Sequence, residues 1–401
     1  MYCEKKKLKS GQVRWECMED GPPNPATGKR KQIKRRAKTQ REAKQRVQKA
    51  IQSLQDDGID ERLGARMLFE DAAKHWLSVY SMTGVKRNTV RIREKEIAIL
   101  NRYIAKTPIG NVTPAMYQKI LNDLSPSYAR TTVQGVNTSA GMIFRQAMKD
   151  KIIKENPTEH VVVPKKRQTV EDIEIEEVME KYLEHNELEE FLNAVRQYGL
   201  DLDIERFYLL AYSGMRSGEA CALKWSDISF EDNTIRITKT LYNENNNMKK
   251  YEITPPKTKG SIRTIHMEPE IMNLLHLHKK RQMKIKLKVG HLLEDYHDAD
   301  FVFCRENGYP FAPSNILKRM DRLLTKTSID KHATPHIFRH TMISMMAEAK
   351  IDVATIMERV GHEDINTTMK IYTHVTNKMK EDASDKVRNL YGNALEKINL
   401  N

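Results

Sequence analysis

The sequence has few cysteines and no long apolar segment. Its four cysteines, Cys3, Cys17, Cys221 and Cys304, are scattered and form no CxxC pair, which argues against a zinc site and fits a reducing compartment. No apolar run approaches the ~20 residues of a membrane-spanning helix. The first ten residues lack the apolar core of a secretory signal peptide. These absences predict a soluble protein without a metal site.

The chain is strongly basic, and its positive charge is concentrated at one end. The 401 residues carry a formal net charge of +14 at pH 7. Residues 1–50 contain 16 Lys and Arg against 5 Asp and Glu. This asymmetry predicts a polyanion-binding head, with a merely solubilising basic surface as the alternative. The length predicts two or three domains.

Residues 1–57 have the pattern of a small sheet with one helix. Residues 10–18 alternate as a strand does, residues 21–29 form a turn-rich loop, and a helical pattern runs from about 39 to 54. Basic residues on a strand suit DNA, because a β-ribbon can enter the major groove. The candidates on or near this strand are Lys29, Arg30, Lys31, Lys34, Arg35 and Arg36.

Residues 65–163 have helical periodicity and contain no recognisable chemical motif. Four amphipathic patterns within about 95 residues predict a helical bundle of ordinary size. Basic residues exposed on this bundle could clamp a duplex, and a solvated helix face is an equally good interpretation. These residues are Lys86, Arg87, Arg91, Arg93 and Arg130.

A third region, residues 182–401, begins with further helical patterns and contains an Arg at a helix break. Residues 207–228 predict a helix, a break at Gly214, and a second helix up to Trp225, with Arg216 at the join. Such an Arg points inward more often than one on an open helix face, although alone it is a weak signal.

Three antiparallel strands are predicted next, at 234–241, 249–254 and 261–267. The last two flank the segment PPKTKG, which we expect at the tip of a hairpin. A lysine there could reach a leaving oxygen and protonate it as a general acid. Lys257 and Lys259 both qualify, and a solubilising turn lysine is the ordinary interpretation without further context.

The stretch from Thr334 to His374 contains the strongest chemical signals. Thr334 and Pro335 predict a helix start, and Phe338, Met342, Met345, Met346 and Ala349 recur on one face of that helix. His336 and Arg339 are three residues apart, so they lie on neighbouring positions of one helix. A second helix should run from Asp352 to Gly361, which tolerates a left-handed turn. His362 follows, and Tyr372 lies in a short helix opened by Asp364 or Asn366.

These residue types suit attack by tyrosine on a nucleic-acid backbone. A guanidinium matches two phosphodiester oxygens, and histidine can donate to them or move a proton near neutral pH. A tyrosine hydroxyl becomes a useful nucleophile when the charge that develops opposite it is stabilised. Each piece alone also has an ordinary explanation: a solvated HxxR pair, a helix cap at Gly361–His362, and a core tyrosine with a solvated hydroxyl.

The order of these boxes resembles the tyrosine recombinase family. The boxes are SGMRSGEACAL, TPPKTKGSIRTI, TPHIFRHT, VGHEDINTTM and IYTHV. The chain most resembles integrases of temperate phages and of integrative conjugative elements of Gram-positive bacteria. Together the boxes are highly specific, and they cover the C-terminal half directly. The bundle resembles the family's core-site-binding domain in pattern only, and the basic head resembles its arm-site-binding domain.

The resemblance implies a role for each matching residue. Tyr372 would be the nucleophile and form a 3′-phosphotyrosyl link, while Arg216 and Arg339 hold the scissile phosphate. His336 would assist the tyrosine proton, and His362 would hydrogen-bond the phosphate. Lys257, which follows the Pro–Pro pair, is preferred over Lys259 as the donor to the 5′-oxygen. Glu219 would be a supporting residue that orients Arg216.

The resemblance further implies a mainly α fold with small β-sheets (α+β) and three domains: an arm-binding head at 1–57, a core-binding bundle at 65–163 and a catalytic domain at 182–401. The partners would be duplex DNA with core and arm sites, a homotetramer on that DNA, and accessory DNA-bending and excision proteins. A tail helix within residues 381–400 could dock on a neighbouring subunit. Neither metal nor any other cofactor is implied, and the location would be the bacterial cytoplasm at the nucleoid.

Two other functions stay open from the sequence. A type IB topoisomerase uses a similar constellation but relaxes DNA as a monomer, and the basic head and tail favour recombination over it. A non-catalytic DNA-binding protein is disfavoured by the intact set of Arg, Lys, His, Arg, His and Tyr.

Overall fold

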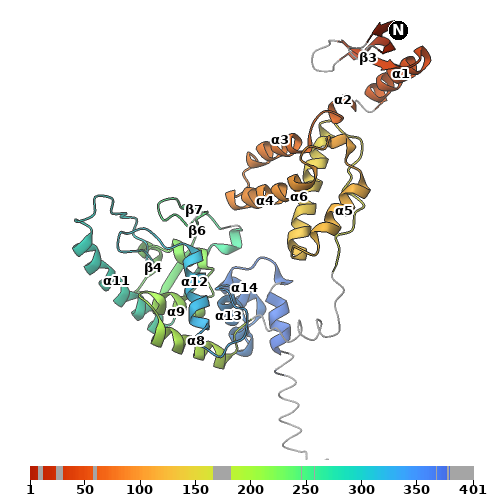
Figure 1. Cartoon of the computed structure of the whole chain (residues 1–401). Coiled ribbons are helices and arrows are strands. Elements are labelled where there is room, and N and C mark those ends of the chain that lie inside the picture. Colours follow the sequence, from red (N-terminus) through yellow and green to blue (C-terminus); the bar gives the residue numbers. More distant parts are fainter. Residues whose placement is uncertain are drawn as a thin grey trace, which may run out of the picture. The chain divides into compact units, whose positions relative to one another are not determined.

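The computed structural model describes most of the chain as two compact units, Met1–Arg167 and Gln168–Asn401. The residues that it describes are 1–7, 12–23, 30–56, 61–165, 182–244, 246–256, 258–366, 368–376 and 379. Figure 1 shows the elements in sequence colours, from the red N-terminal strands to the blue C-terminal helices. The predicted tail helix at 381–400 lies outside the described residues.

The N-terminal segment is a small sheet with one helix, as the sequence predicts, and the sheet has three antiparallel strands. Its strands β1 (Tyr2–Lys7), β2 (Val13–Pro23) and β3 (Arg30–Ala37) follow one another in the order β1-β2-β3. Helix α1 (Gln40–Asp56) packs its apolar face on this sheet. Strand β1 was not predicted, because its run of lysines hides the alternation of a strand.

A disulfide in the head departs from the reducing compartment that the scattered cysteines suggested. Cys3 and Cys17 are opposite each other in the β1–β2 register and are bonded, with their Cα atoms 4.1 Å apart. Cys17 is fully buried under α1, whereas Cys221 and Cys304 remain free thiols. The sequence could not reveal the pairing, because it depends on the register between two strands.

The helical segment that follows contains the four predicted amphipathic helices. They are α3 (Phe69–Ser81), α4 (Arg87–Ile104), α5 (Pro114–Leu124) and α6 (Arg130–Lys149), with the short α2 (Glu61–Gly64) before them and the 3-10 turn η1 (Ile109–Asn111) between α4 and α5. Thr113 accepts a hydrogen bond from the Met116 amide, and Pro114 occupies the first turn, so α5 begins where its capping residues require. Phe69, Tyr117 and Phe144 meet in its core.

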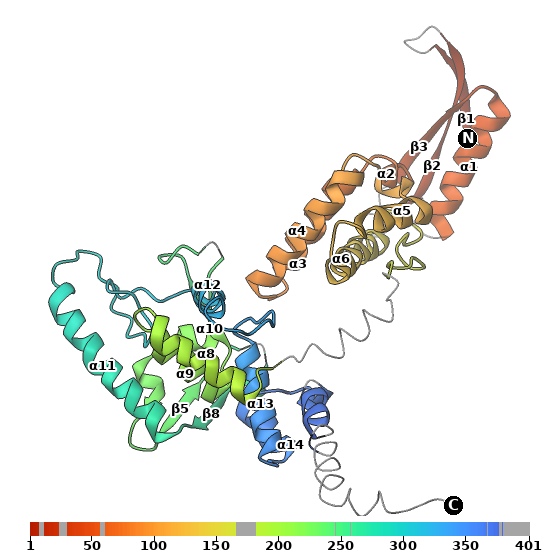
Figure 2. The same ribbon diagram turned by 60° about the horizontal axis from the view of Figure 1, so that its bottom comes forward.

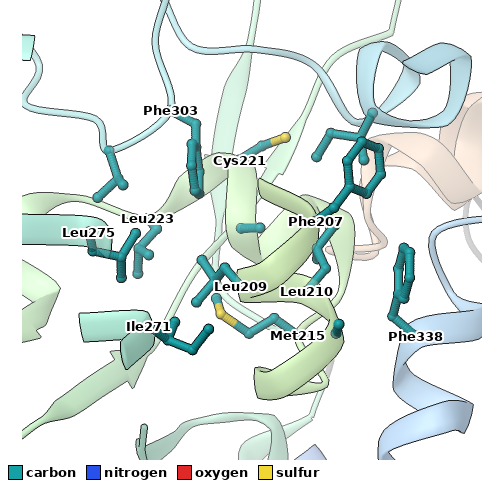
Figure 3. Packing of buried hydrophobic residues seen from close by; sticks show 14 of the residues in the cluster. Phe207, Leu209, Leu210, Met215, Cys221, Leu223, Ile271, Leu275, Phe303 and Phe338 are labelled. Atoms are coloured by element: carbon teal, nitrogen blue, oxygen red, sulfur yellow. The ribbon is translucent and has the colours of Figure 1, made fainter. Parts of the chain in front are cut away.

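The C-terminal unit is mainly helical, and its largest core is aromatic and aliphatic. Its helices are α8 (His185–Tyr198), α9 (Asp203–Ser213), α10 (Ser217–Ala222), α11 (Pro269–Val289), α12 (Pro313–Leu324), α13 (Ile337–Glu348) and α14 (Val353–Val360), with a 3-10 turn η2 (Trp225–Asp227). Phe191, Phe207 and Phe338 form a cluster of rings with centroids 5.2–6.0 Å apart. Figure 3 shows Phe207 and Phe338 within this core, which fixes α9 against α13.

The strands of this unit form two small sheets, which corrects one prediction. β4 (Ile228–Ser229), β5 (Thr234–Ile237) and β8 (Arg263–His266) form one antiparallel sheet. β6 (Thr240–Tyr242) and β7 (Glu252–Thr254) form the other. The predicted strand at 234–241 is therefore divided between two sheets. β7 and β8 lie in different sheets, so they do not form the predicted hairpin.

The helices nearest the HxxR motif begin and end close to the predicted residues. Helix α13 starts at Ile337, because Thr334 to His336 form a turn in which the Ile337 amide donates to the Thr334 carbonyl over 2.8 Å. Ala349, predicted on the inner face, lies past the end of α13 and is exposed. Figure 2 shows α13 beside α14, which ends at Gly361 as predicted. No helix among the described residues is both long and apolar enough to cross a membrane.

Candidate active site

A left-handed glycine positions the first candidate residue, Arg216. Helix α9 ends at Gly214, whose φ of 62° is accessible to glycine at little cost. A Cβ atom there would lie 3.3 Å from Val360 and 3.4 Å from Met342, so the turn also packs closely against α14 and α13. The chain then turns directly into α10, with Arg216 at its N-cap. The Arg216 side chain remains 37% exposed.

Glu219 fixes the orientation of Arg216. The carboxylate accepts from the Arg216 Nη1 over 2.7 Å and from the Arg216 backbone amide over 3.1 Å. A second arginine, Arg263 of β8, donates to Glu219 Oε2 over 3.1 Å. Burial alone would raise the pKa of Glu219, but the charges and hydrogen bonds of Arg263 and Arg216 outweigh burial and lower that pKa. Glu219 is therefore an ionised, buried anchor.

Arg339 is the most deeply buried cation of the site. Its side chain is fully inaccessible to water. Its Nη1 donates to the Gly214 carbonyl over 3.0 Å, and its Nε donates to His362 Nε2 over 3.0 Å. Its Nη2 has no hydrogen-bond partner within the described part of the chain. Burial, together with the charge of Arg216, lowers the pKa of Arg339 to about 9.

His362 lies between Arg339 and the helical residues 368–376. It follows Gly361, which closes α14 with a φ of 68°. Because its Nε2 accepts from Arg339, its proton is assigned to Nδ1, which is 2.8 Å from Thr368 Oγ1. Burial and the charges of Arg339 and Arg216 lower the pKa of His362 to about 3. The imidazole is therefore neutral in this arrangement, and its Nε2 acts as an acceptor.

His336 lies at the surface, immediately before α13. Its ring meets that of His340 edge to face, with centroids 4.9 Å apart. Desolvation by the protein around it, with the charges of His340 and Arg339, lowers the pKa of His336 to about 4 although the residue is exposed. A neutral His336 could accept a proton, which is the requirement for a general base.

Tyr372 lies on the helical residues 368–376. It is half-buried and packs against a cluster that includes Ile343 of α13 and Val360 of α14. Tyr372 is four residues after Thr368, so the two lie on the same face of this helix, one turn apart. Through Thr368 the helix is bonded to His362, which links the tyrosine helix to Arg339. Sequence reasoning missed Thr368, because a threonine inside an amphipathic helix gives no distinct signal.

The lysine segment is only partly described. Lys257 and the side chain of Lys259 lie outside the described residues. The 3-10 turn η3 (Lys259–Ser261) is nevertheless tied to the turn that carries His362, because the Gly260 amide donates to Glu363 Oε1 over 2.8 Å. A Cβ atom on Gly361 would lie 3.0 Å from the Gly260 carbonyl oxygen, so these two turns pack closely.

The basic residues predicted in the head do not share one face. Strand alternation places Arg35 opposite Cys17, on the side that α1 covers, whereas Lys34 and Arg36 lie on the opposite side. Lys6 and Arg14, paired across β1 and β2, also lie on this opposite side and were missed. We call Lys6, Arg14, Lys34 and Arg36 the outer face of the head. Arg30 and Lys31 are exposed near the start of β3, and Lys29 lies outside the described residues.

A buried glutamate lies at the centre of the outer face. Glu16 is 3% exposed. Its Oε1 accepts from Lys6 Nζ over 3.0 Å, and its Oε2 accepts from Arg36 Nε. The outer face therefore combines three exposed cations and the half-buried Arg14 with one carboxylate that holds two of them.

In the helical segment the predicted basic residues divide into two groups. Arg87 is exposed and Arg91 is half-buried on α4. Arg93 corrects the prediction, because its side chain is only 17% exposed and donates to Glu96 over 2.7 Å and to Ser139 over 3.3 Å. Arg93 therefore stabilises the packing of α4 on α6. The described residues contain no cluster of three His, Cys, Asp or Glu side chains with the geometry of a metal site.

Comparison with known proteins gives consistent similarities. The model of the phage integrase family matches residues 181–379. The chain is 31% identical over 353 residues to the prophage ps2 probable integrase of Lactococcus lactis, which covers 85% of this chain and 89% of that protein. It is 34% identical over 306 residues to the integrase of Staphylococcus phage L54a, covering 71% of this chain and 85% of the relative. The ICEBs1 integrase of Bacillus subtilis is 25% identical over 397 residues, which cover 96% and 99% of the two chains.

Solved structures are similar in fold. The Tn1549 transposon integrase in complex with a circular intermediate DNA has a TM-score of 0.61 at 20% identity, covering 79% of this chain and 99% of that chain. A lambda integrase dimer bound to a COC′ core site has a TM-score of 0.54 at 15% identity, covering 92% of this chain and 94% of that chain. At these identities the likeness concerns the fold.

Proposed function

Because the chain belongs to the phage integrase family, which makes it a tyrosine site-specific recombinase, we propose that it cuts and rejoins duplex DNA through Tyr372. The Tyr372 oxygen attacks a backbone phosphorus, and a 3′-phosphotyrosyl bond forms as the bond from phosphorus to the 5′-oxygen breaks. The 5′-oxygen leaves with a proton as a hydroxyl. A second 5′-hydroxyl then reverses these steps and releases Tyr372, so the phosphodiester energy is retained.

The observation that carries this proposal is that Nη2 of the buried Arg339 has no hydrogen-bond partner among the residues that the structure describes. A buried N–H without an acceptor is costly in a folded protein, and an anion is the ligand that relieves it best. The charge of Arg216 contributes to lowering the pKa of Arg339, so the two guanidinium groups lie near each other in the site. A phosphodiester, which supplies a negative charge and two acceptor oxygens, fits this arrangement. Because both cations are fixed before the DNA binds, they stabilise the crowded transition state without reorganisation.

The remaining roles are assigned as the family resemblance implies. His336, neutral at pH 7, receives the Tyr372 proton. His362 supports the site by holding Arg339 through its Nε2, and it would donate to the phosphate only after this hydrogen bond rearranges. Lys257 protonates the 5′-oxygen, with Lys259 as the alternative donor. Glu219 orients Arg216 through two hydrogen bonds.

The two N-terminal segments are proposed to bind DNA outside the cleavage site. The bundle at 65–163, with Arg87 and Arg91 among its basic residues, would hold the core site. The head at 1–57 would hold an arm site through its outer face, since a three-stranded sheet can enter the major groove. A homotetramer would assemble on paired sites, with DNA-bending and excision proteins as accessory partners and the tail at 381–400 docked on a neighbouring subunit. The DNA complexes of the integrases of Tn1549 and phage lambda support duplex DNA as the substrate.

We expect Tyr372→Phe to retain DNA binding and to form no covalent complex. The removed hydroxyl is the only atom of the side chain that can bond to phosphorus, so the loss should be complete. In the assay, the protein is incubated in EDTA with nicked duplexes that carry the neighbouring attachment region. A covalent complex is then detected as an SDS-resistant adduct. An adduct of the wild-type protein should map to Tyr372 by peptide mass. Adduct formation by the variant would refute the assignment, and relaxation of supercoiled DNA without paired sites would favour a topoisomerase.

We expect removal of residues 1–57 to spare cleavage of a core site and to impair integration. The head has its own apolar core around Cys17, Ile33 and Val47, so its loss should leave the other cores intact. The same nicked core duplex measures cleavage, and a two-plasmid assay measures integration. Integration at the wild-type level by the truncated protein would contradict an arm-binding role for the head.

A further inference from the structure

Arg263 is a buried cation that the predicted catalytic set does not include. It lies on β8 and is 7% exposed. All three of its nitrogens donate to other protein groups. Nε donates to the Arg359 carbonyl over 2.8 Å, Nη1 to the Ser261 carbonyl over 3.0 Å, and Nη2 to Glu219 Oε2 over 3.1 Å. The side chain is only 3% exposed and each of its nitrogens already donates to the protein, so its effect on DNA should pass through these partners.

Two of these partners belong to segments that carry candidate catalytic residues. Glu219 orients Arg216. Arg359 is in the last turn of α14, directly before the Gly361–His362 turn. Nη1 of Arg263 would lie only 3.0 Å from a Cβ atom on Gly361, so the guanidinium packs directly under this turn. One guanidinium thus connects the Arg216 side of the site to the His362 side.

The third partner extends the connection to the lysine segment. Ser261 closes η3, the turn that follows Lys257 and includes Lys259. Its carbonyl accepts from Arg263, and its hydroxyl lies 3.0 Å from that of Thr258. The end of the lysine segment is therefore fixed to the same guanidinium that holds Glu219.

Arg359 continues this arrangement toward the Gly214 turn. Its Nη2 donates to the Tyr212 carbonyl over 3.0 Å, and its Nη1 donates to the His266 carbonyl at the end of β8. The Gly214 carbonyl, two residues after Tyr212, accepts from Arg339. Arg359 of α14 thus holds the end of β8 and the end of α9. The Gly214 turn that follows α9 leads into Arg216 and accepts a hydrogen bond from Arg339.

We propose that Arg263 is a positioning residue for DNA cleavage, which sets Arg216, His362 and the lysine segment in register around the scissile phosphate. This inference rests on the proposed recombinase function. Arg263 touches neither the phosphate nor the nucleophile. It acts by keeping Glu219 ionised and aligned and by fixing the turns of Ser261 and Gly361.

The charge of Arg263 gives the positioning role a pH dependence that a purely structural residue would not produce. Glu219 faces Arg263 from β8 and Arg216 from its own helix start, and it interacts electrostatically with Arg339 and His336 at α13. Arg263 is the first of the groups that lower the pKa of Glu219 against its burial. Without Arg263, that pKa should rise. Glu219 would then become protonated at a higher pH, and its hold on Arg216 would weaken as the pH falls.

The experiment compares Arg263→Met with Arg206→Met in the full-length protein. Arg206 is a matched control: it is a buried arginine of the same unit, 4% exposed, but it pairs with Asp203 and stacks on Phe311, with no bond to Glu219. Adduct formation on the nicked duplex is followed in single turnover between pH 5 and 9. Binding of the same DNA and thermal unfolding are measured alongside.

We expect Arg263→Met to slow adduct formation by about 10²-fold at pH 7, since small misplacements of catalytic groups cost about that much. In this variant, the fall of the rate toward acid pH (the acid limb of the pH–rate profile) should begin at a higher pH. The double variant Arg263→Met/Glu219→Gln should not show this shift of the acid limb, because it has no carboxylate to protonate. Arg206→Met should lower the unfolding temperature and leave the limb in place. Arg263→Lys retains the charge but cannot reach all three acceptors. It should slow the reaction by roughly tenfold without moving the limb.

The outcomes separate this inference from the proposed function. Failure of the wild-type protein to form any adduct would overturn the function itself. If the wild-type protein cleaves while Arg263→Met has the rate and acid limb of Arg206→Met, the positioning role is wrong. If Arg263→Met does not fold, Arg263→Lys decides, and a wild-type rate for that variant overturns the inference.

Discussion

Arg263 and Arg339 of the C-terminal unit and the cations of the head's outer face are held in opposite ways. Arg339 is fully buried, and the Arg263 side chain is 3% exposed. Each donates to two or more protein acceptors. On the outer face, the Arg36 side chain is 45% exposed and that of Lys6 is 49% exposed, and Glu16 is their shared partner. Arg339 and the outer-face cations are suited to phosphate, but only Arg339 is fixed in place by the protein interior.

This difference indicates two separate uses of positive charge. Buried guanidiniums are preorganised, so they can stabilise charge that develops during a reaction. Exposed cations neutralise DNA phosphates and release counterions, which gives affinity that depends on salt. Substitutions in the first set should therefore change the rate of cleavage, and substitutions in the second set should change the affinity for DNA and its salt dependence.

Among substitutions of the two sets of cations, the largest expected effect follows from Arg339→Lys. Lysine retains one charge but cannot donate to Gly214 and His362 and also to a phosphate in the planar arrangement of a guanidinium. Loss of one preorganised donor typically costs about 10²–10³-fold in rate, so single-turnover adduct formation should fall by at least that factor. Core-site binding, measured at one salt concentration, should change by only a few fold. Equal losses of binding and cleavage would remove the distinction between the two sets of cations.

Several elements of the fold could be predicted because their signals are local. Thr113–Pro114 marks the start of α5, and Gly361 marks the end of α14, where the backbone needs a left-handed residue. The division of 234–241 between two sheets could not be predicted, because periodicity does not identify the partner of a strand. The Cys3–Cys17 bond was missed for the same reason, since it depends on the β1–β2 register.

The candidate site shows the same limit. The residue types and spacing of His336, Arg339 and His362 were visible in the sequence, and the structure brings Arg339 and His362 into direct contact. The residues that orient the site, Arg263 through Glu219 and Thr368 through His362, were not visible. Their importance comes from long-range contacts, and an arginine in a strand or a threonine in a helix has no distinctive local pattern. Sequence thus indicated the reacting groups better than the groups that orient them.

A smaller effect is expected from Lys34→Ala in the head, with Arg35→Ala as its matched control. The two residues are adjacent on β3, but Lys34 lies on the outer face and Arg35 on the side covered by α1. Each lost phosphate contact reduces the slope of log K against log salt by about 0.9. Lys34→Ala should therefore weaken binding of arm-site DNA several-fold and reduce this slope by about one.

Arg35→Ala should leave the slope unchanged, and core cleavage should be normal for both variants. Fluorescence titrations of arm-site DNA at several salt concentrations measure the slope directly. A slope reduced equally in both variants would show that the faces of β3 do not differ, and the comparison between the outer face and the covered face would fail.

The smallest effect concerns stability at acid pH, and it should be confined to the C-terminal unit. Burial and nearby arginines lower the pKa of His362 to about 3 and contribute to lowering that of His336 to about 4, whereas unfolded histidine titrates near 6.5. Between pH 6.5 and 4 the unfolded chain therefore binds protons that the folded chain does not. The free energy of unfolding must decrease as pH falls through this window. Residues 1–57 contain no histidine, so the head lacks this source of acid sensitivity.

The three tryptophans make this difference measurable, because Trp15, Trp76 and Trp225 lie in the head, the bundle and the C-terminal unit respectively. In a Trp15→Phe/Trp76→Phe background, the unfolding temperature reported by Trp225 should fall between pH 7 and pH 5, by about 2–4 °C per kcal/mol lost. His362→Gln can still accept from Arg339 and donate to Thr368, and it should make this fall smaller. His160→Gln, an exposed substitution in the other unit, should not. An equal fall of the unfolding temperature in the background protein and in both histidine variants would mean that the buried arginines do not make His362 resist protonation. The two sets of cations would then differ in exposure alone.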